Sequence, residues 1–299
     1  MKAALIHCPA GGSASAEDHA RAAALLGEHF ELRVYTCETG GDPAELARAA
    51  LADGATLLVA QGGDGTTSAV ASAVCRTDHA SLGIVPAGTA NSIAGHLGIP
   101  KDVEGACAVI VGGHERVVDT SIANGKTMVL LAAIGLHAQA IVEADPERKR
   151  RFGALAYLVE AAAQARALTP FAATLEVDGH VAEIEACAVT IANMAPKTTL
   201  LAQGPDRVID DDGLLDVTLV HFEGVAEALV TALHLATSAL GETPATRANI
   251  GHFRARSVRV ITHEPQTLMI DGEEAGSGPL HVESRPGSLR VRVPAGTGG

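Results

Sequence analysis

Residues 56–70 read TLLVAQGGDGTTSAV, and this stretch decides the fold. Its first half is an unbroken apolar run with the length of a buried β-strand. The glycines Gly62, Gly63 and Gly65 then end the run, and small residues with helical character follow. A buried strand that passes through glycines directly into a helix is typical of a parallel sheet in an α/β domain.

The same order of strand, turn and helix recurs on both sides of this stretch. One helix has Asp42 as its N-cap, Pro43 at its first position and Gly54 beyond its end, which are start and stop signals. Residues 1–118 are therefore predicted to form an α/β domain with a doubly wound, mainly parallel sheet. The predicted strands cover 3–7, 32–37, 56–60 and 82–85, and the predicted helices include 17–30 and 102–111.

Beyond residue 118 the pattern changes to alternating apolar residues separated by hairpin turns. Asn124-Gly125 and Asp178-Gly179 each lie between two such runs, and these dipeptides favour two-residue hairpins. Residues 119–299 are therefore predicted to form a mainly antiparallel, sandwich-like β domain, whose last strand is a candidate for return to the first domain. The predicted strands cover 172–177, 181–192, 257–262, 266–270 and 288–293, with helical inserts over 146–168 and 224–240.

Composition and charge narrow the class of function. The 299 residues are 47% hydrophobic and 19% charged, as in a folded soluble protein. The net charge of −13 repels phosphate backbones, so binding to nucleic acid is disfavoured. The apolar segments are interrupted by polar residues and predict no membrane span. The five cysteines are odd in number and scattered, so we expect neither a disulfide framework nor a zinc site, and a cytoplasmic location fits best.

The turn at 62–68 has the composition of a phosphate-binding loop. Successive N–H groups at a helix start bind anions, and glycines let the anion approach the backbone. Asp64 makes sense there beside Mg²⁺ or as an acceptor for a substrate hydroxyl; the alternative is an ordinary helix N-cap. The loop matches neither a Walker A motif nor the GxGxxG dinucleotide pattern.

A second glycine turn follows the next strand, where residues 86–91 read PAGTAN. The carboxyl ends of parallel strands meet at one edge of a sheet, so both turns are predicted to clamp the phosphates of one nucleotide. The alternative for Thr89 and Asn91 is local helix capping.

Two acidic segments lie in the second half of the chain. Asp271-Gly272-Glu273 follows an apolar run and reads as a tight turn that displays two carboxylates, which phosphoryl transfer to an alcohol can use. The alternative is a solvated hairpin turn. Residues 210–216 read DDDGLLD, which is either a solvated loop or a site for a hard cation.

Together, GGDGT at 62–66, the turn at 86–91 and Asp271-Gly272-Glu273 resemble the catalytic domain of the diacylglycerol kinase and sphingosine kinase family, in particular its small soluble bacterial lipid kinases. The resemblance extends over nearly the whole chain. It implies an ATP- and Mg²⁺-dependent lipid kinase in which Glu273 is the base and Asp64 helps to position the metal. The residues implied in nucleotide binding are Pro9, Gly11, Thr36, Gly62, Gly63, Asp64, Gly65, Thr66, Thr67, Ser68, Gly88, Thr89 and Asn91.

The resemblance also implies a structural Mg²⁺ at Asp212, Leu214 and Ile209. Two departures stand out: Cys8 replaces the Asn of the family's first turn, and Ser68 stands where many relatives carry Asn. The lipid partner would be met at a membrane surface. The basic run at 148–151 is either an ordinary solvated face or a contact for nucleotide phosphates or for the anionic inner face of the membrane. A homodimer is compatible with the sequence. The alternatives that stay open are an NAD or sugar kinase with the same GGDG turn, and a non-catalytic nucleotide- or lipid-binding relative.

Overall fold

The computed structural model describes residues 1–8, 15–38, 40–135, 170–195, 208–222 and 247–296, with positions 227, 230, 231 and 234. The two predicted helical inserts and the basic run at 148–151 lie outside the described residues, apart from those four positions. Among the described residues, no helix is long and apolar enough to cross a membrane.

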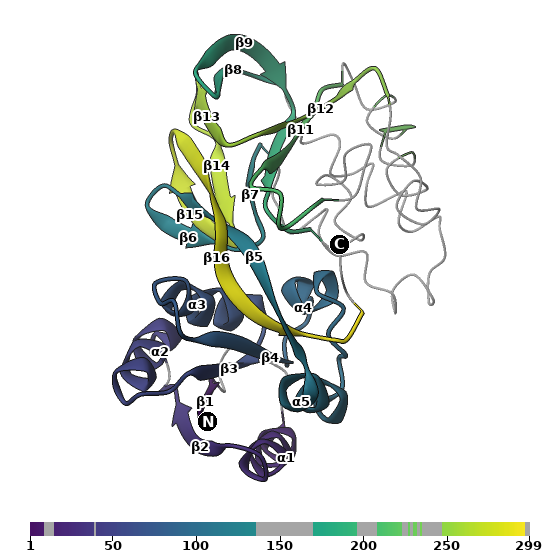
Figure 1. Cartoon of the computed structure of the whole chain (residues 1–299). Coiled ribbons are helices and arrows are strands. Elements are labelled where there is room, and N and C mark those ends of the chain that lie inside the picture. Colours follow the sequence, from purple (N-terminus) through teal and green to yellow (C-terminus); the bar gives the residue numbers. More distant parts are fainter. Residues whose placement is uncertain are drawn as a thin grey trace.

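The N-terminal half is a parallel sheet with helices on both faces (Figure 1). The strand order β2-β1-β3-β4 confirms the prediction of a doubly wound sheet. Helix α1 packs beside α5, and α2 packs beside α3. The elements are β1 (Lys2–His7), α1 (Ala16–Gly27), β2 (Glu31–Thr36), α2 (Pro43–Ala52), β3 (Leu57–Gly62), α3 (Asp64–Val74), β4 (Ser81–Pro86), α4 (Ser92–His96) and α5 (Val103–Gly112).

Local sequence explains where these elements begin and how closely they pack. Asp42 caps α2 by accepting a hydrogen bond from the Ala44 N–H at 2.8 Å, as the sequence predicts. Every residue of β3 and β4 is buried, because helices cover both faces of the sheet. The core there is built from Ala, Val, Leu and Ile.

The C-terminal half is mainly antiparallel and confirms the predicted β-rich domain. Among the described residues, a six-stranded sheet has the order β12-β11-β10-β7-β14-β15, and the other strands of this half extend the N-terminal sheet to ten strands. The strands are β5 (His114–Ala123), β6 (Lys126–Met128), β7 (Leu131–Ile134), β8 (Phe171–Val177), β9 (His180–Ala186), β10 (Ala188–Ala192), β11 (Leu215–Val220), β12 (Ile250–Ala255), β13 (Ser257–Thr262), β14 (Thr267–Ile270), β15 (Glu273–Ser277) and β16 (Leu280–Val293).

Hairpin turns lie where the sequence places them. Asn124 and Asp178 have φ angles of 46° and 47°, and each is followed by a glycine with positive φ. Two consecutive positive φ angles define the type I′ turn, which Asn-Gly and Asp-Gly favour.

Two predicted strands need correction. The run over 181–192 is two strands, because the chain changes sheets at Cys187, whose N–H donates to the Val220 carbonyl at 2.7 Å. The run over 288–293 is only the end of β16, which pairs with β13 and β5 and reaches β4 through Val291 opposite Leu82. Figure 1 shows this long yellow strand crossing from one half of the molecule to the other.

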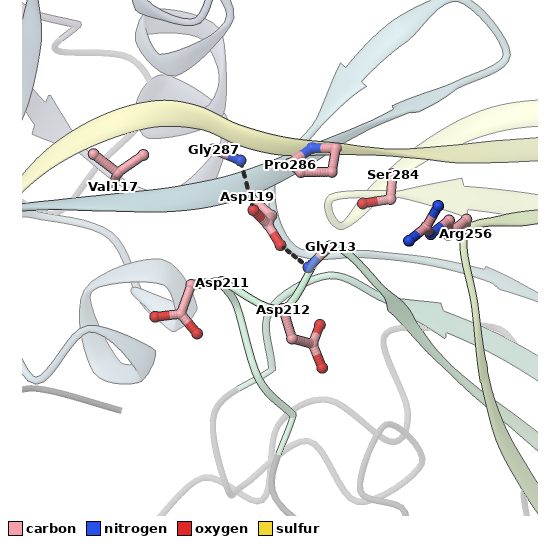
Figure 2. Close-up of a pocket in the computed structure, with 9 residues that line it drawn as sticks. All are labelled: Val117, Asp119, Asp211, Asp212, Gly213, Arg256, Ser284, Pro286 and Gly287. Carbon is pink, nitrogen blue, oxygen red and sulfur yellow. Dashed lines mark hydrogen bonds between the residues drawn. The ribbon is translucent and has the colours of Figure 1, made fainter.

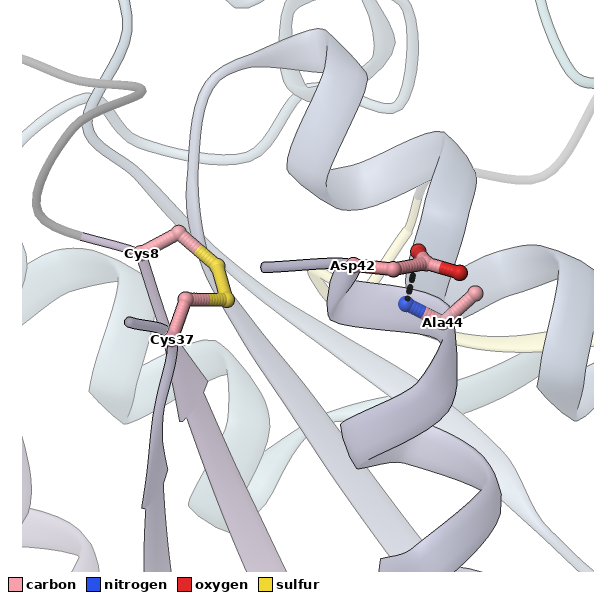
Figure 3. The surroundings of a disulfide bond; sticks show 4 residues. All are labelled: Cys8, Cys37, Asp42 and Ala44. Carbon is pink, nitrogen blue, oxygen red and sulfur yellow. Dashed lines mark hydrogen bonds between the residues drawn. A yellow bond between two sulfur atoms is a disulfide. The ribbon is translucent and has the colours of Figure 1, made fainter. Parts of the chain in front are cut away.

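The cysteine prediction is also wrong, because Cys8 and Cys37 form a disulfide (Figure 3). Strands β1 and β2 are parallel neighbours with His7 opposite Thr36, so the next residue on each strand is a cysteine beside its partner. Their Cα atoms lie 4.7 Å apart. The spacing of 29 residues between the two cysteines does not indicate a disulfide, because their pairing depends on the register of the sheet.

Candidate active site

The two glycine turns lie in direct contact. Gly63 follows β3 and is the N-cap of α3, without a side-chain cap. A Cβ atom on Gly88 would collide with the Cα atom of Gly63, so this approach requires glycine at position 88. The predicted pair of turns is therefore one continuous surface at the carboxyl ends of β3 and β4.

Asp64 joins these turns by capping the neighbouring helix instead of its own. Its carboxylate oxygens accept hydrogen bonds from the Ser92 and Ile93 N–H groups, each at 2.9 Å. These N–H groups begin α4, the short helix after the second turn. Asp64 thus fixes the start of α4 relative to the start of α3.

Asn91 closes the second turn on itself. Its Oδ1 accepts a hydrogen bond from the Gly88 N–H at 2.8 Å, and its Nδ2 donates to the Gly88 carbonyl at 2.7 Å. The alternative of local helix capping is wrong for the Asn91 side chain, which makes no cap hydrogen bond to α4. The Gly88 N–H already has a partner in this side chain. Thr89 is exposed at the tip of this turn.

The other residues of the first turn divide into buried and exposed groups. Thr66 and Thr67 are buried, and the Thr67 hydroxyl donates to the Gly63 carbonyl at 3.0 Å. Gly65 is exposed at the first turn of α3. The N–H groups of a first helical turn have no partner within the helix, so this turn is where an anion can be bound.

The Asp271-Gly272 turn is a type I′ hairpin between β14 and β15, with φ angles of 49° and 86°. The expectation that it displays two carboxylates is wrong for Asp271, whose side chain is buried. That carboxylate accepts hydrogen bonds from the N–H groups of Val129 at 2.9 Å, Leu130 at 2.8 Å and Leu131 at 3.2 Å.

Ser68 completes the contacts of Asp271. Its hydroxyl on α3 donates to Asp271 Oδ2 at 2.8 Å. Burial raises the pKa of the Asp271 carboxyl, although the hydrogen bonds it accepts oppose the shift. The hydroxyl therefore ties the C-terminal hairpin to the helix that begins at the first glycine turn.

Glu273, the first residue of β15, is exposed. Its Oε1 atom lies 3.3 Å from the position that a Cβ atom would take on Gly65. The fold thus brings the third motif against the first glycine turn, although the two are far apart in the sequence. A substrate group at the start of α3 would meet Glu273 directly.

Other predicted contacts lie outside this cluster. Thr36 is exposed at the end of β2, and β1 separates β2 from β3. Pro9 and Gly11 lie outside the described residues.

The predicted metal residues lie on the loop of residues 208–214, which we call the acidic loop. Asp212 Oδ1 accepts a hydrogen bond from the Leu214 N–H at 2.9 Å, and its Oδ2 lies 3.3 Å from Arg254 Nη1. A guanidinium thus already neutralises the only side-chain ligand expected for the ion. Ile209 is exposed on the same loop.

A pocket of about 630 Å³ lies beside this loop (Figure 2). Asp119 holds the acidic loop against β16, because its carboxylate accepts hydrogen bonds from the N–H groups of Gly213 at 2.6 Å and Gly287 at 2.7 Å. Burial raises the pKa of Asp119, opposed by these hydrogen bonds. The pocket is lined by Val117, Asp119, Asp211, Asp212, Gly213, Arg256, Ser284, Pro286 and Gly287.

Carboxylates of the described residues do not gather into a metal cage: no group of three His, Cys, Asp or Glu side chains in that part of the chain could hold an ion. Mg²⁺ does not require such a cage, because one or two carboxylates together with phosphate oxygens commonly hold it. Asp64 and Glu273 at the glycine turns suit that mode of binding.

Two contacts of this site escape sequence reasoning, namely the Ser68 bond to Asp271 and the Asp64 cap on α4. Both join residues whose contact depends on tertiary packing. The available signal was the Asp-Gly turn after the apolar run 268–270, which places Asp271 next to buried residues but does not name its partners.

Models of two known domains match this chain. The diacylglycerol kinase catalytic domain matches residues 2–123, and the YegS C-terminal NAD kinase beta sandwich-like domain matches residues 131–293. A probable lipid kinase YegS-like protein of Stenotrophomonas maltophilia is 33% identical over 281 residues, which cover 90% of this chain and 89% of that protein. A diacylglycerol kinase of Bacillus subtilis is 29% identical, and the match covers 84% of this chain and 82% of that one.

One further relative matches this chain over only part of its own length, and two solved structures share its fold. An uncharacterized protein of Synechocystis is 40% identical over 81% of this chain, but the chain spans only 56% of that protein. The structure of a diacylglycerol kinase from Bacillus anthracis shares the fold, with a TM-score of 0.74 at 22% identity over 98% of this chain and 97% of that one. Yeast NADH kinase shares it more distantly, with a TM-score of 0.57 at 12% identity over 99% of this chain and 84% of that one.

The arrangement of the three motifs agrees with both domain matches and with the identity to relatives of similar length. The chain therefore belongs to the diacylglycerol kinase and YegS-like family of lipid kinases.

Proposed function

We propose that this chain transfers the γ-phosphate of ATP, with Mg²⁺, to the hydroxyl of a diacylglycerol-like or related lipid. The observation that carries the proposal is the approach of Glu273 to Gly65, which puts an exposed carboxylate beside the start of α3. A hydroxyl bound there would have a proton acceptor on one side and the phosphate on the other.

The nucleotide would bind with its phosphates on the first turn of α3. The N–H groups of Gly65 and Thr66 belong to that turn, and the helix dipole favours an anion there. The contact of Gly88 with Gly63 supports a shared surface for both glycine turns. Asn91 would act by shaping the second turn, since its side chain is bonded to Gly88.

Mg²⁺ would neutralise the phosphate charge as the lipid hydroxyl attacks. The Asp64 carboxylate fits this role in part, because each of its oxygens retains a lone pair beyond the bonds to Ser92 and Ile93. Glu273 would accept the proton of the lipid hydroxyl.

A structural ion at Asp212, Leu214 and Ile209 is a separate proposal, which the contact of Asp212 with Arg254 weakens. It predicts that Mg²⁺ raises the melting temperature of the wild type but not that of Asp212→Asn.

The lipid would be reached at a membrane surface, and a cytoplasmic location at the inner face fits ATP as the donor. The net charge of −13 opposes long-range attraction to anionic lipids. We therefore expect transfer to lipid in vesicles to become faster when salt screens this repulsion.

The test is transfer of labelled γ-phosphate from ATP with Mg²⁺ to diacylglycerol, a sphingosine-like base, a total bacterial lipid extract and NAD. Label in lipid that depends on Asp64 and Glu273 is expected. Glu273→Gln should lower turnover by roughly 10²–10⁴-fold, whereas the neighbouring exposed Glu274→Gln should leave it unchanged. Asp64→Asn should abolish turnover, with the exposed Asp78→Asn as its matched control.

The similarity of fold to yeast NADH kinase makes an NAD kinase the second candidate. Label found only in NAD would establish it in place of the lipid kinase. ATP binding without any labelled product would instead indicate a non-catalytic relative.

A further inference from the structure

The short helix α4 is held at both of its ends by side chains from elsewhere in the fold. It has only five residues, Ser92–His96, and a helix of one turn has no stability of its own. Asp64 binds its first N–H groups. Its last residue, His96, is buried with a side chain only 2% exposed.

His96 connects α4 to the C-terminal half of the molecule. Its Nδ1 lies 3.0 Å from the carbonyl oxygen of Ala195, and its Nε2 lies 3.1 Å from Asp210 Oδ2. A carbonyl and a carboxylate can only accept hydrogen bonds, so a ring nitrogen of His96 that carries a proton has an acceptor in place on either side. Ala195 follows β10 and Asp210 precedes β11, so both partners lie on segments next to strands of the C-terminal sheet.

Asp210 is itself firmly held. Its side chain is 8% exposed and forms an ion pair with Arg116 of β5. Its carbonyl accepts a hydrogen bond from the Asp119 N–H, also on β5, at 2.7 Å. Strand β5 pairs along most of the length of β16, the strand that joins the two halves, so Asp210 is a fixed point for His96.

The two carboxylates of the proposed reaction lie on opposite sides of this connection. Asp64 is bonded to α4 in the N-terminal half, and Glu273 is on a hairpin of the six-stranded C-terminal sheet. A displacement of α4 would pull Ser92 and Ile93 away from Asp64. Reacting groups are sensitive to such movement, since a displacement of about 1 Å can cost 10²-fold in rate.

We propose that His96 is a positioning residue, which through its bond to Asp210 fixes α4 and thereby sets Asp64 and the second glycine turn relative to Glu273. The proposal rests on the proposed kinase function for its kinetic consequence. The anchoring of α4 by itself requires no activity.

Two substitutions separate the bonds of His96. Glutamine can place an amide donor near the former Nε2 and keep the bond to Asp210, whereas asparagine can place one near Nδ1 and keep only the bond to Ala195. We expect His96→Asn to lower kcat by about ten- to a hundredfold, with the KM for lipid nearly unchanged. His96→Gln should retain most of the wild-type kcat, and the exposed His79→Ala is the control.

Amide hydrogen exchange of residues 88–97 supplies a readout that does not depend on turnover. We expect these amides to exchange faster in His96→Asn than in the wild type and in His96→Gln. The proposal would be overturned if residues 88–97 exchanged equally fast in both variants. It would also be overturned if the variants lost stability while kcat and KM of the folded enzyme stayed unchanged in both. Wild-type protein without transfer to any acceptor would contradict the kinase function, while the exchange data would still decide whether His96 anchors α4.

Discussion

The strongest structural prediction concerns Asp271, the buried carboxylate beneath the hairpin that carries Glu273. Replacing it with alanine removes the acceptor for the three N–H groups at 129–131. It also places alanine at a φ of 49°, where aspartate and asparagine are tolerated better than other side chains.

The expected cost follows from these contacts. Each buried N–H group left without a partner costs about 1–3 kcal/mol, and a non-glycine residue in the left-handed region costs about 1–2 kcal/mol. Three such N–H groups at the lower end of the range give at least about 3 kcal/mol for Asp271→Ala, and the less favourable φ of alanine relative to aspartate adds to this cost. Asparagine keeps one acceptor oxygen for Leu130 and Leu131 but turns an amide towards the Val129 N–H, so Asp271→Asn should cost about 1–3 kcal/mol.

Urea unfolding at pH 7 measures these differences, with Ser68→Ala as the variant that removes only the hydroxyl contact. Turnover of the folded fraction should also fall in both Asp271 variants, because Glu273 loses the support of its turn. A free energy of unfolding for Asp271→Ala within about 1 kcal/mol of the wild type would refute the reasoning, since no unsatisfied donor could then have been created.

Three further predictions concern the ionisation of Asp271, the contact of Gly88 with Gly63, and the disulfide. Because burial raises the pKa of Asp271 above its ordinary value of 3.8, its stabilising contribution is complete below that value and is lost as the pH rises through the folded pKa. The stability margin of the wild type over Asp271→Asn should therefore shrink in urea titrations as the pH rises above 3.8, and a margin that grows would contradict this. Gly88→Ala should weaken ATP binding at least about tenfold in calorimetry, because its Cβ collides with Gly63; unchanged affinity would mean that the turns need not touch. Unfolding without reductant should expose three thiols, and unfolding after reduction should expose five; five thiols without reductant would exclude the disulfide. Cys37→Ser should lower the free energy of unfolding by roughly 3–4 kcal/mol, as expected for a disulfide that closes a loop of this length.

The sequence by itself determined the layers of the fold and the positions of its turns. Apolar runs that end in glycines specify the parallel strands, because periodicity and turn chemistry are local properties. The same holds for the hairpins at Asn124-Gly125 and Asp178-Gly179, since a type I′ turn depends only on its two central residues. The three motifs likewise indicated the family.

Only the tertiary structure decided what the individual carboxylates do. Asp271 and Glu273 are two residues apart and look equivalent in the sequence, yet one is buried under three backbone N–H groups and the other is exposed. The disulfide between Cys8 and Cys37 depends on the parallel register of β1 with β2. Such contacts join residues that are distant in the chain, and their energies depend on desolvation and on the geometry of the partner. Local sequence encodes neither of these, so the contacts of Asp64, Asp271 and His96 follow only from the tertiary structure.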